Sequence, residues 1–535
     1  MNQPETTKKP LIYLRDLGFW NLYFLIKYYL FYKGTINFHF LENFAFILFL
    51  VAPFQEKSLQ IFRKYIAIPV GISVLYLDTY LPGIDTLIMQ IDRLLGFNAE
   101  YLFELTTRLI DFKVIASAVI VFGIFQLLKY TVRFTSITIV GYLYFALMPE
   151  EVELSPPVAV LNNTQTQSTT FANIDTRSSN LDQSSEQSYL NSFFQTESQR
   201  LVPFDNTELK APFDVLIMNI CSLSWKELEY TGLANHVLFE KFDLLFRNFN
   251  VATSYSGPAS IRLLRASCGQ SKHTNLYDQA SEQCYLYENF AKLGFDHELV
   301  INHDGKYNNY LRNLSQYAGW NVEAQELSQT PVIQRAFDSS PIYSDRALFD
   351  DWLARHNETK PRATFSQSIS LHDGNKLLGD QASLSSLENF HPRLLSLLND
   401  LNYFFEKIEQ SGRKVMLIMI PEHGAGIEGD KLQLPGMREF PTPALTHVPV
   451  GVKFFGAKGI SSETININDK TSYLAISRLI QQSIDHDIFG EPTSTMPQII
   501  QTLPSTEFVS ENDDSKMILF NGRYRLQVGK DWVDY

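Results

Sequence analysis

Sulfur, carboxylate and imidazole groups follow two apolar segments that we expect to form buried strands. In "FDVLIMNICSLSW", Cys221 comes at the end of the apolar run. In "KVMLIMIPEHGAG", Glu422 and His423 follow the apolar run. The carboxyl ends of parallel strands meet at one edge of a sheet, and these three side chains together suit Zn²⁺. Each signal is weak alone, because a single cysteine is most often a small buried hydrophobe and Glu-His pairs are common on surfaces. The combination predicts a metal site.

A candidate nucleophile lies in "NVATSYSGPASIRLLRASCG", where a loop ending in Ser-Gly-Pro opens a predicted helix. Ser256 is expected close to the helix N-terminus, where backbone N–H groups and the helix dipole favour a phosphate. A simpler interpretation is an N-cap serine, with Pro258 in the first turn. The two interpretations are compatible.

Other polar residues occur in loops around these motifs. Tyr255 precedes the candidate nucleophile and is expected to pack or hydrogen-bond at the site. His372 in "SLHDGN" is a candidate proton donor or phosphate ligand, or a surface histidine, and Arg438 in "GMREFP" is a candidate ligand of a phosphate oxygen. His303 and Asp304 in "INHDGK" are interpreted as loop residues, because no other feature supports a metal there.

The elements before these motifs are apolar and indicate a membrane domain. Five segments, at about 17–33, 38–54, 65–81, 112–128 and 134–149, each approach the ~17–25 residues that cross a bilayer. Lys27, Glu42 and Asp78 interrupt them, and such charges snorkel or face the bundle interior. Any single segment could instead be a buried core helix. We expect residues 1–150 to form a helical transmembrane bundle of about five spans.

Basic residues set the expected topology, because Lys and Arg concentrate in cytoplasmic loops. They precede the first span and lie between spans two and three and between spans four and five: Lys8, Lys9, Arg15, Lys57, Arg63, Lys64, Lys129 and Arg133. With five spans, the chain after residue 150 is extracytoplasmic. Residues 83–110 have helical apolar spacing and are expected on the outer membrane surface. They form either a plain connection or a helix that helps present a lipid headgroup.

The remaining chain divides into a polar linker and a folded domain. Residues 151–204 are rich in Ser, Thr, Asn and Gln and are expected to be flexible or only locally helical. From residue 205 to 535, short β-branched runs alternate with helical segments, which predicts an α/β domain with a mostly parallel sheet. The net charge of −13 argues against a nucleic-acid partner.

The three cysteines add a constraint. Cys268 and Cys284 are separated by 16 positions, and in an extracytoplasmic domain a disulfide closing that loop would contribute roughly 3 kcal/mol. Cys221 would then be unpaired, and metal binding would protect its thiol from oxidation.

With these motifs in view, the chain resembles the phosphoethanolamine transferases of the alkaline phosphatase/sulfatase superfamily. The blocks "NICSLSW", "HTNLY", "LHDGN", "GRKVMLIMIPEHG" and "VPVGVKFFG", with "GFWNLYFLIKY" and "DWVDY" near the two ends, more closely resemble the cellulose-modifying BcsG family. The resemblance covers nearly the whole chain outside the linker. Relatives that modify lipid A typically have a threonine nucleophile, a first-strand glutamate and an Asp-His pair. Here these positions are Ser256, Cys221 and Glu422-His423.

The resemblance implies a fold, a reaction and a set of site residues. The fold is an alkaline-phosphatase-like α/β sandwich behind a membrane anchor. The implied reaction is zinc-dependent transfer of phosphoethanolamine from phosphatidylethanolamine to glucose 6-hydroxyls of nascent cellulose, through a covalent phosphoserine-type intermediate. The implied zinc ligands are Cys221, Glu422 and His423 with Ser256, and the residues implied around the phosphate are Tyr255, His372 and Arg438.

The resemblance also implies a multi-pass protein of the bacterial inner membrane, with its C-terminal domain in the periplasm and the cellulose synthase complex as a partner. Two alternatives stay open. One is a transferase that acts on lipid A or another glycan. The other is a non-catalytic, membrane-anchored glycan-binding subunit with a structural zinc.

Overall fold

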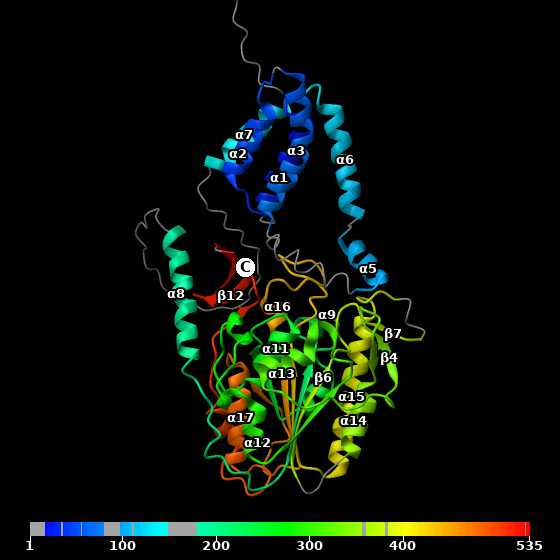
Figure 1. Cartoon of the computed structure of the whole chain (residues 1–535), viewed down its shortest axis with the longest axis vertical. Helices are drawn as coiled ribbons and strands as arrows, with labels where there is room; N and C mark the ends of the chain where they lie inside the picture. The colour runs from blue at the N-terminus through cyan, green and yellow to red at the C-terminus, as the bar shows by residue number, and fades with distance from the viewer. Residues whose placement is uncertain are drawn as a thin grey trace, which may run out of the picture. The chain divides into compact units, whose positions relative to one another are not determined.

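The computed structural model describes residues 16–33, 36–54, 56–79, 97–109, 112–147, 179–355, 360–379, 384–529 and 531–535. The chain forms two compact units (Figure 1). Unit 1 consists of Met1–Gly83 and Ile110–Thr176, and unit 2 of Ile84–Leu109 and Arg177–Tyr535. Each unit is described by itself.

Unit 1 has a helix in each of the five predicted apolar segments. These are α1 (Trp20–Tyr32), α2 (Phe40–Val51), α3 (Lys57–Asp78), α6 (Phe112–Leu128) and α7 (Phe134–Leu147). Among the described residues, α3 alone is both long and apolar enough to cross a membrane, and α2, Val119–Leu128 and α7 are shorter apolar helices. The helix α3 begins at Lys57 rather than near residue 65, because the basic residues expected in a loop are good helix formers and form its first turns.

Two of the three predicted interrupting charges face the interior of unit 1. Lys27 and Asp78 form an ion pair in which both side chains are almost fully buried. Lys27 Nζ donates to Asn43 Oδ1 at 2.7 Å, and Asn43 Nδ2 donates to Asp78 Oδ2 at 2.8 Å. Glu42, in the first turn of α2, is exposed. Pairing reduces the cost of burying the two charges.

The main sheet of unit 2, within the described residues, has seven strands in the order β10-β2-β9-β8-β1-β6-β3. Their bounds are β1 (Asp214–Ile220), β2 (Leu244–Asn250), β3 (Asp296–Ile301), β6 (Arg362–Ser368), β8 (Val415–Pro421), β9 (His447–Phe455) and β10 (Ile465–Ile467). Strand β1 pairs in parallel with β6 and β8, whereas β9 runs antiparallel to β2 and β8. The predicted mostly parallel sheet is confirmed as a mixed sheet with one reversed strand.

Helices cover both faces of this sheet (Figure 1). Alternate residues of β1 point to opposite sides, so that Val215 and Ile217 join one core and Leu216 and Met218 the other. The first core contains α11 (Ser256–Leu264), α12 (Leu286–Lys292), α13 (Tyr310–Ala318) and α17 (Tyr473–Asp485). The second contains α9 (Trp225–Tyr230), α10 (Leu238–Lys241), α14 (Asp345–Ala354) and α15 (Phe390–Ser411).

The range predicted as a linker contains a helix of unit 2, α8 (Ser179–Glu197). Leu190, Phe193 and Phe194 form a stripe at helical spacing and pack against Ile518 and Trp532 of a small antiparallel sheet. That sheet consists of β11 (Val509–Glu511), β12 (Ser515–Phe520), β13 (Arg523–Val528) and β14 (Asp531–Asp534). These apolar residues, with the partly buried Tyr189 and the ion pair of Arg525 with the buried Glu186, attach the second half of a largely polar segment to the rest of unit 2. Residues 151–178 lie outside the described part of the chain.

A further helix of unit 2, α5 (Ala99–Leu109), lies between α3 and α6 in sequence. It falls within the predicted helical range 83–110, of which residues 83–96 and 110 lie outside the described residues. The other elements are β4 (Val332–Arg335), β5 (Pro341–Tyr343), β7 (Lys376–Leu377), α16 (Pro443–Thr446), α18 (Met496–Ile500) and the 3₁₀ turns His273–Tyr277, Glu282–Cys284 and Tyr307–Asn309.

Candidate active site

Three predicted metal ligands meet where β1 and β8 end. Ile220 and Pro421 are paired in register, so Cys221 and Glu422 follow the strands at the same level. The ligand atoms of Cys221, Glu422 and His423 all lie within 4.8 Å of one another, and all three residues are buried. The sheet therefore brings together residues that are 200 positions apart in sequence.

The predicted nucleophile adjoins this group. Ser256 is the first residue of α11, and its Oγ lies 3.4 Å from Cys221 Sγ and 3.2 Å from His423 Nε2. The N-cap residue is Tyr255, which is partly exposed and makes no side-chain capping bond. The interpretation of Ser256 as a capping serine is therefore wrong, and its hydroxyl points to the metal-ligand group instead.

His423 is held in the tautomer that a metal ligand needs. Its Nδ1 lies 2.8 Å from the carbonyl oxygen of Gly424. Because a carbonyl oxygen only accepts, Nδ1 carries the proton and Nε2 keeps its lone pair. Burial and the charge of Arg438 hold the pKa of His423 well below its usual range, so the imidazole is neutral.

Glu422 is oriented through one of its two oxygens. Ser260 Oγ and Gln367 Nε2 donate to Oε1 at 3.1 and 3.0 Å. The other oxygen, Oε2, is buried and makes no hydrogen bond within the described part of the chain. His303 donates to Gln367 through Nε2, because its Nδ1 accepts the Gly305 N–H at 3.0 Å. His303, expected to be an ordinary loop residue, therefore supports the glutamate indirectly.

The three ligands fit a bound cation. Burial and the neighbouring Glu422 raise the pKa of Cys221 to about 12, and burial also raises the pKa of Glu422. Two acidic groups are thus buried together, and a divalent cation between them would stabilise both charged forms. A thiolate, an unpartnered carboxylate oxygen and the lone pair of an imidazole Nε2 match the donor set that zinc prefers.

His372 and Arg438 reach the same site from the loops after β6 and β8. Arg438 Nη1 lies 3.4 Å from His423 Nε2, and Arg438 Nη2 lies 3.4 Å from His372 Nε2. His372 donates its Nδ1 proton to the carbonyl oxygen of Asp373 at 2.6 Å. Burial and Arg438 lower the pKa of His372 to about 3, so its Nε2 is an acceptor at neutral pH.

Two features next to the ligands were not predicted. Ser222 has a φ of 70°, which is uncommon outside glycine, and its hydroxyl lies 3.3 Å from Cys221 Sγ. Glu227 accepts the backbone N–H of Ser224 at 2.8 Å and that of Gly426 at 2.9 Å. The Ser-x-x-Glu pattern at the start of α9 is a capping-box signal that could have identified Glu227.

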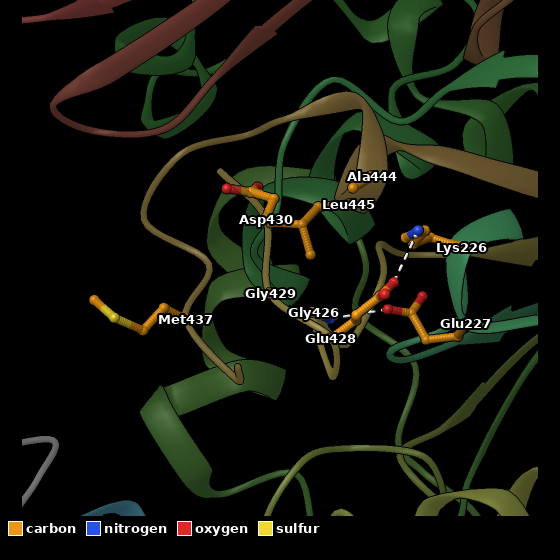
Figure 2. Close-up of a pocket in the computed structure, with 9 residues that line it drawn as sticks. All are labelled: Lys226, Glu227, Gly426, Glu428, Gly429, Asp430, Met437, Ala444 and Leu445. Atoms are coloured by element: carbon orange, nitrogen blue, oxygen red, sulfur yellow. Dashed lines mark hydrogen bonds and ion pairs between the residues drawn. The ribbon is translucent and has the colours of Figure 1, made fainter. Parts of the chain in front are cut away.

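Figure 2 shows the surroundings of Glu227, a hollow of about 10 Å³ between α9 and the loop that follows β8. Lys226 pairs with Glu428 across it at 2.8 Å, and Glu227 points to Gly426. None of the seven predicted site residues lines this hollow. These two contacts hold the loop that carries Glu422 and His423 against α9.

The predicted disulfide is confirmed. Cys268 and Cys284 are bonded, with their Cα atoms 4.8 Å apart, shortly after the end of α11. Cys221 is the free cysteine and is buried.

Two family profiles match the chain. The C-terminal domain of cellulose biosynthesis protein BcsG matches residues 170–532, and the N-terminal domain of that protein matches residues 20–147. Among solved structures, a protein of the alkaline phosphatase superfamily from Vibrio parahaemolyticus has a TM-score of 0.46 at 14% identity, over 65% of this chain and 87% of that one. The C-terminal periplasmic domain of EcEptC from Escherichia coli has a TM-score of 0.41 at 11% identity, over 63% and 96%.

Two curated relatives match almost end to end. The cellulose biosynthesis protein BcsG of Escherichia coli K12 is 36% identical over an alignment of 558 positions, which covers 98% of this chain and 97% of that protein. The BcsG protein of Salmonella typhimurium LT2 is 37% identical over an alignment of 550 positions, with the same coverage. The chain therefore belongs to the family of the cellulose biosynthesis protein BcsG.

Proposed function

We propose that this chain transfers phosphoethanolamine from phosphatidylethanolamine to glucose 6-hydroxyls of cellulose while the polymer is being made. Membership of the BcsG family confirms the predicted enzyme class, a phosphoethanolamine transferase. The lipid donor, the cellulose acceptor, the zinc ion and the residue roles are parts of the proposal.

The observation that carries the proposal is the position of the Ser256 hydroxyl, at the start of α11 and within 3.4 Å of both Cys221 Sγ and His423 Nε2. Zinc held by Cys221, Glu422 and His423 would lower the pKa of this hydroxyl and polarise the phosphate. Ser256 Oγ gives up its proton and attacks phosphorus, the bond to the glycerol oxygen breaks, and that oxygen takes up a proton, so that diacylglycerol leaves. The backbone N–H groups at the start of α11 favour the phosphate charge.

The second half of the reaction frees the serine. A glucose 6-hydroxyl attacks phosphorus, the bond to Ser256 Oγ breaks, and the acceptor proton is taken up by His372 Nε2. In the described site Arg438 lies beside both His372 and His423. An incoming phosphate offers the guanidinium a stronger acceptor, which releases His372 Nε2 to act as a base. Tyr255, directly before the nucleophile, is proposed to contact the phosphate.

The proposal includes the membrane topology. The five helices of unit 1 would cross the inner membrane, with the domain after residue 150 in the periplasm, near the lipid donor and the cellulose synthase complex. Tethering raises the effective concentration of the domain at the membrane. The apolar segments and the basic residues near their ends support this arrangement.

The decisive experiment incubates the full chain in phosphatidylethanolamine vesicles that carry a labelled headgroup. The parent protein should release diacylglycerol and acquire the label on Ser256, and added cellulose oligomers should then remove the label. Ser256→Ala should do neither, and a zinc chelator should abolish labelling of the parent. Ser281→Ala, a change at an exposed serine, is the control.

Transfer to cellulose by Ser256→Ala would refute the nucleophile assignment. Removal of the label by lipid A but not by cellulose oligomers would refute the acceptor. Stoichiometric zinc without any transfer would support the non-catalytic alternative.

A further inference from the structure

The helix α5 is attached to the active-site loops of unit 2 through a buried ion pair. Arg108 of α5 donates to both oxygens of Asp373, at 2.7 Å from Nη1 and 3.0 Å from Nη2. Tyr101, two turns earlier on α5, donates to Asp373 Oδ2 at 2.9 Å. The Arg108 and Asp373 side chains are only 9% and 4% exposed. A bidentate, buried pair of this kind fixes geometry as well as charge.

Further contacts hold this pair in place. Arg108 Nη2 also donates to Glu104 Oε1 at 2.7 Å, and Ser386 Oγ donates to Asp373 Oδ1 at 2.9 Å. Burial alone would raise the pKa of Asp373, but the hydrogen bonds and charge of Arg108 outweigh it and keep that pKa well below its usual range. The carboxylate is therefore charged whenever Arg108 is present.

The same helix supports His372. Asp373 follows His372 directly and accepts its Nδ1 proton through the backbone carbonyl. The ring of Phe337 packs against the ring of His372, with centroids 4.7 Å apart. The backbone carbonyl of Phe337 accepts the N–H of Asn98, which directly precedes α5. Tyr101 packs in the same small apolar cluster as Phe337. The imidazole is thus positioned by groups that are themselves bound to the α5 segment.

Arg108 also contacts the loop that carries Arg438. Gly436 has a φ of 85°, and a Cβ atom at this position would lie 2.6 Å from Arg108 Nη1 and 2.8 Å from Asp373 Oδ2. The ion pair therefore packs directly against the Gly436 backbone, two residues before Arg438. The Arg108–Asp373 ion pair therefore links the loop after β6, which carries Asp373, to the loop after β8, which carries Gly436.

We infer that α5, a helix whose sequence lies between two helices of unit 1, completes the active site, and that Arg108 is a positioning residue that sets His372 and Arg438 relative to each other. The inference rests on the proposed function for the roles of those two residues. Without α5, Asp373 would be a buried carboxylate without its cation, and both loops would rearrange.

The test uses the full chain in phosphatidylethanolamine vesicles with the headgroup-transfer assay. Arg108→Met should lower kcat on the order of 10–100-fold, because misplacing catalytic groups by about 1 Å has effects of that size. The KM for the lipid should change by less than about 3-fold, because Arg108 is buried and does not reach the donor. Arg108→Lys should retain an intermediate kcat, and Arg108→Met/Asp373→Asn should recover part of the loss, because no unpaired carboxylate remains.

A matched control is Arg413→Met, which removes a second buried Arg–Asp pair, Arg413 with Asp214, at the opposite end of β1. It should leave kcat unchanged. Hydrogen exchange of residues 369–376 and 436–438 should accelerate in Arg108→Met and not in Arg413→Met. Unchanged exchange of both loops, or an equal fall in kcat in the two variants, would overturn the inference. These outcomes are distinct from a failure of the proposed function, which Ser256→Ala reports in the same assay.

Discussion

The two histidines of the site share one arrangement at the residue scale. His423 and His372 each donate Nδ1–H to the carbonyl of the next residue, Gly424 or Asp373, and each presents Nε2 to the site. The residues themselves could be predicted from sequence, His423 because it follows an apolar strand and His372 because it lies in a Gly-containing loop. The groups that orient Glu422 could not, because their positions depend on how strands distant in sequence are ordered in the sheet. Gln367 is an example.

Gln367 should control metal affinity without binding the metal. It donates to Glu422 Oε1 and leaves Oε2 as the free ligand atom. Gln367→Leu should weaken metal binding about 10–100-fold, the usual effect of removing such a supporting hydrogen bond. Competition with a chromophoric chelator measures this change. Gln481→Leu, at a buried glutamine of α17, is the control, and equal affinities in the two variants would contradict the assignment.

His372 should make stability depend on pH. Its pKa is about 3 in the folded protein because of burial and Arg438, against about 6.5 in an unfolded chain. The unfolded state therefore binds more protons between these values, so the contribution of His372 is complete above pH 6.5 and is lost as pH falls toward 3.

Replacement with an uncharged residue should remove that loss. Between pH 7.5 and pH 5, the free energy of unfolding of His372→Gln should rise by up to about 2 kcal/mol relative to that of the parent. The thermal midpoints of the two proteins, measured in detergent, should therefore converge. His391→Gln, at an exposed histidine of α15, should track the parent. A constant difference between His372→Gln and the parent across this range would show that the histidine titrates normally.

At the scale of elements, strands that depend on local sequence could be predicted, whereas a helix that depends on long-range packing could not. The strands β1 and β8 could be predicted because short, continuous apolar runs bounded by polar residues are local features of the sequence. The helix α8 lies in a segment of polar composition, and only four of its residues, Tyr189, Leu190, Phe193 and Phe194, pack in one apolar cluster with the rest of unit 2. The average composition of a long polar segment conceals a stripe of a few apolar residues. Their helical spacing identifies a packing face only when the surface that they contact is known.

The docking of α8 should therefore depend on this stripe. Phe194→Ala should reduce the free energy that holds α8 on unit 2 by about 3 kcal/mol, at the lower end of the usual range for replacing a buried phenylalanine with alanine. Local opening would become about 100-fold more frequent, and proteolysis within Ser179–Glu197 should accelerate correspondingly. Gln195→Ala, on the exposed face of the same helix, should leave the cleavage rate unchanged. Equal rates in the two variants would mean that other contacts hold α8.

At the scale of the whole molecule, the chain passes between its two units three times, after Gly83, after Leu109 and after Thr176. The sequence predicted one passage, through the polar linker. It could not assign α5, because an amphipathic helix shows the same apolar spacing whether it covers a membrane or a protein surface. The Arg108 and Tyr101 contacts with Asp373 resolve that ambiguity in favour of unit 2. Unit 2 is therefore built from two separate parts of the chain.

Because unit 2 is built from two separate parts of the chain, cutting the chain between them tests whether their contacts hold the unit together. A protease site inserted near residue 165, between the part with α5 and the part with the sheet, would divide unit 2 into two fragments. Under the proposed topology, the cut C-terminal fragment should stay bound to isolated membranes, because α5 would remain in the anchored N-terminal fragment and its buried contacts are only weakly screened by salt. Arg108→Met/Tyr101→Phe should increase release at least about tenfold, which needs only about 1.4 kcal/mol, whereas Arg413→Met should not. Complete release of the cut parent protein at physiological salt would show that α5 contributes little to holding unit 2 together.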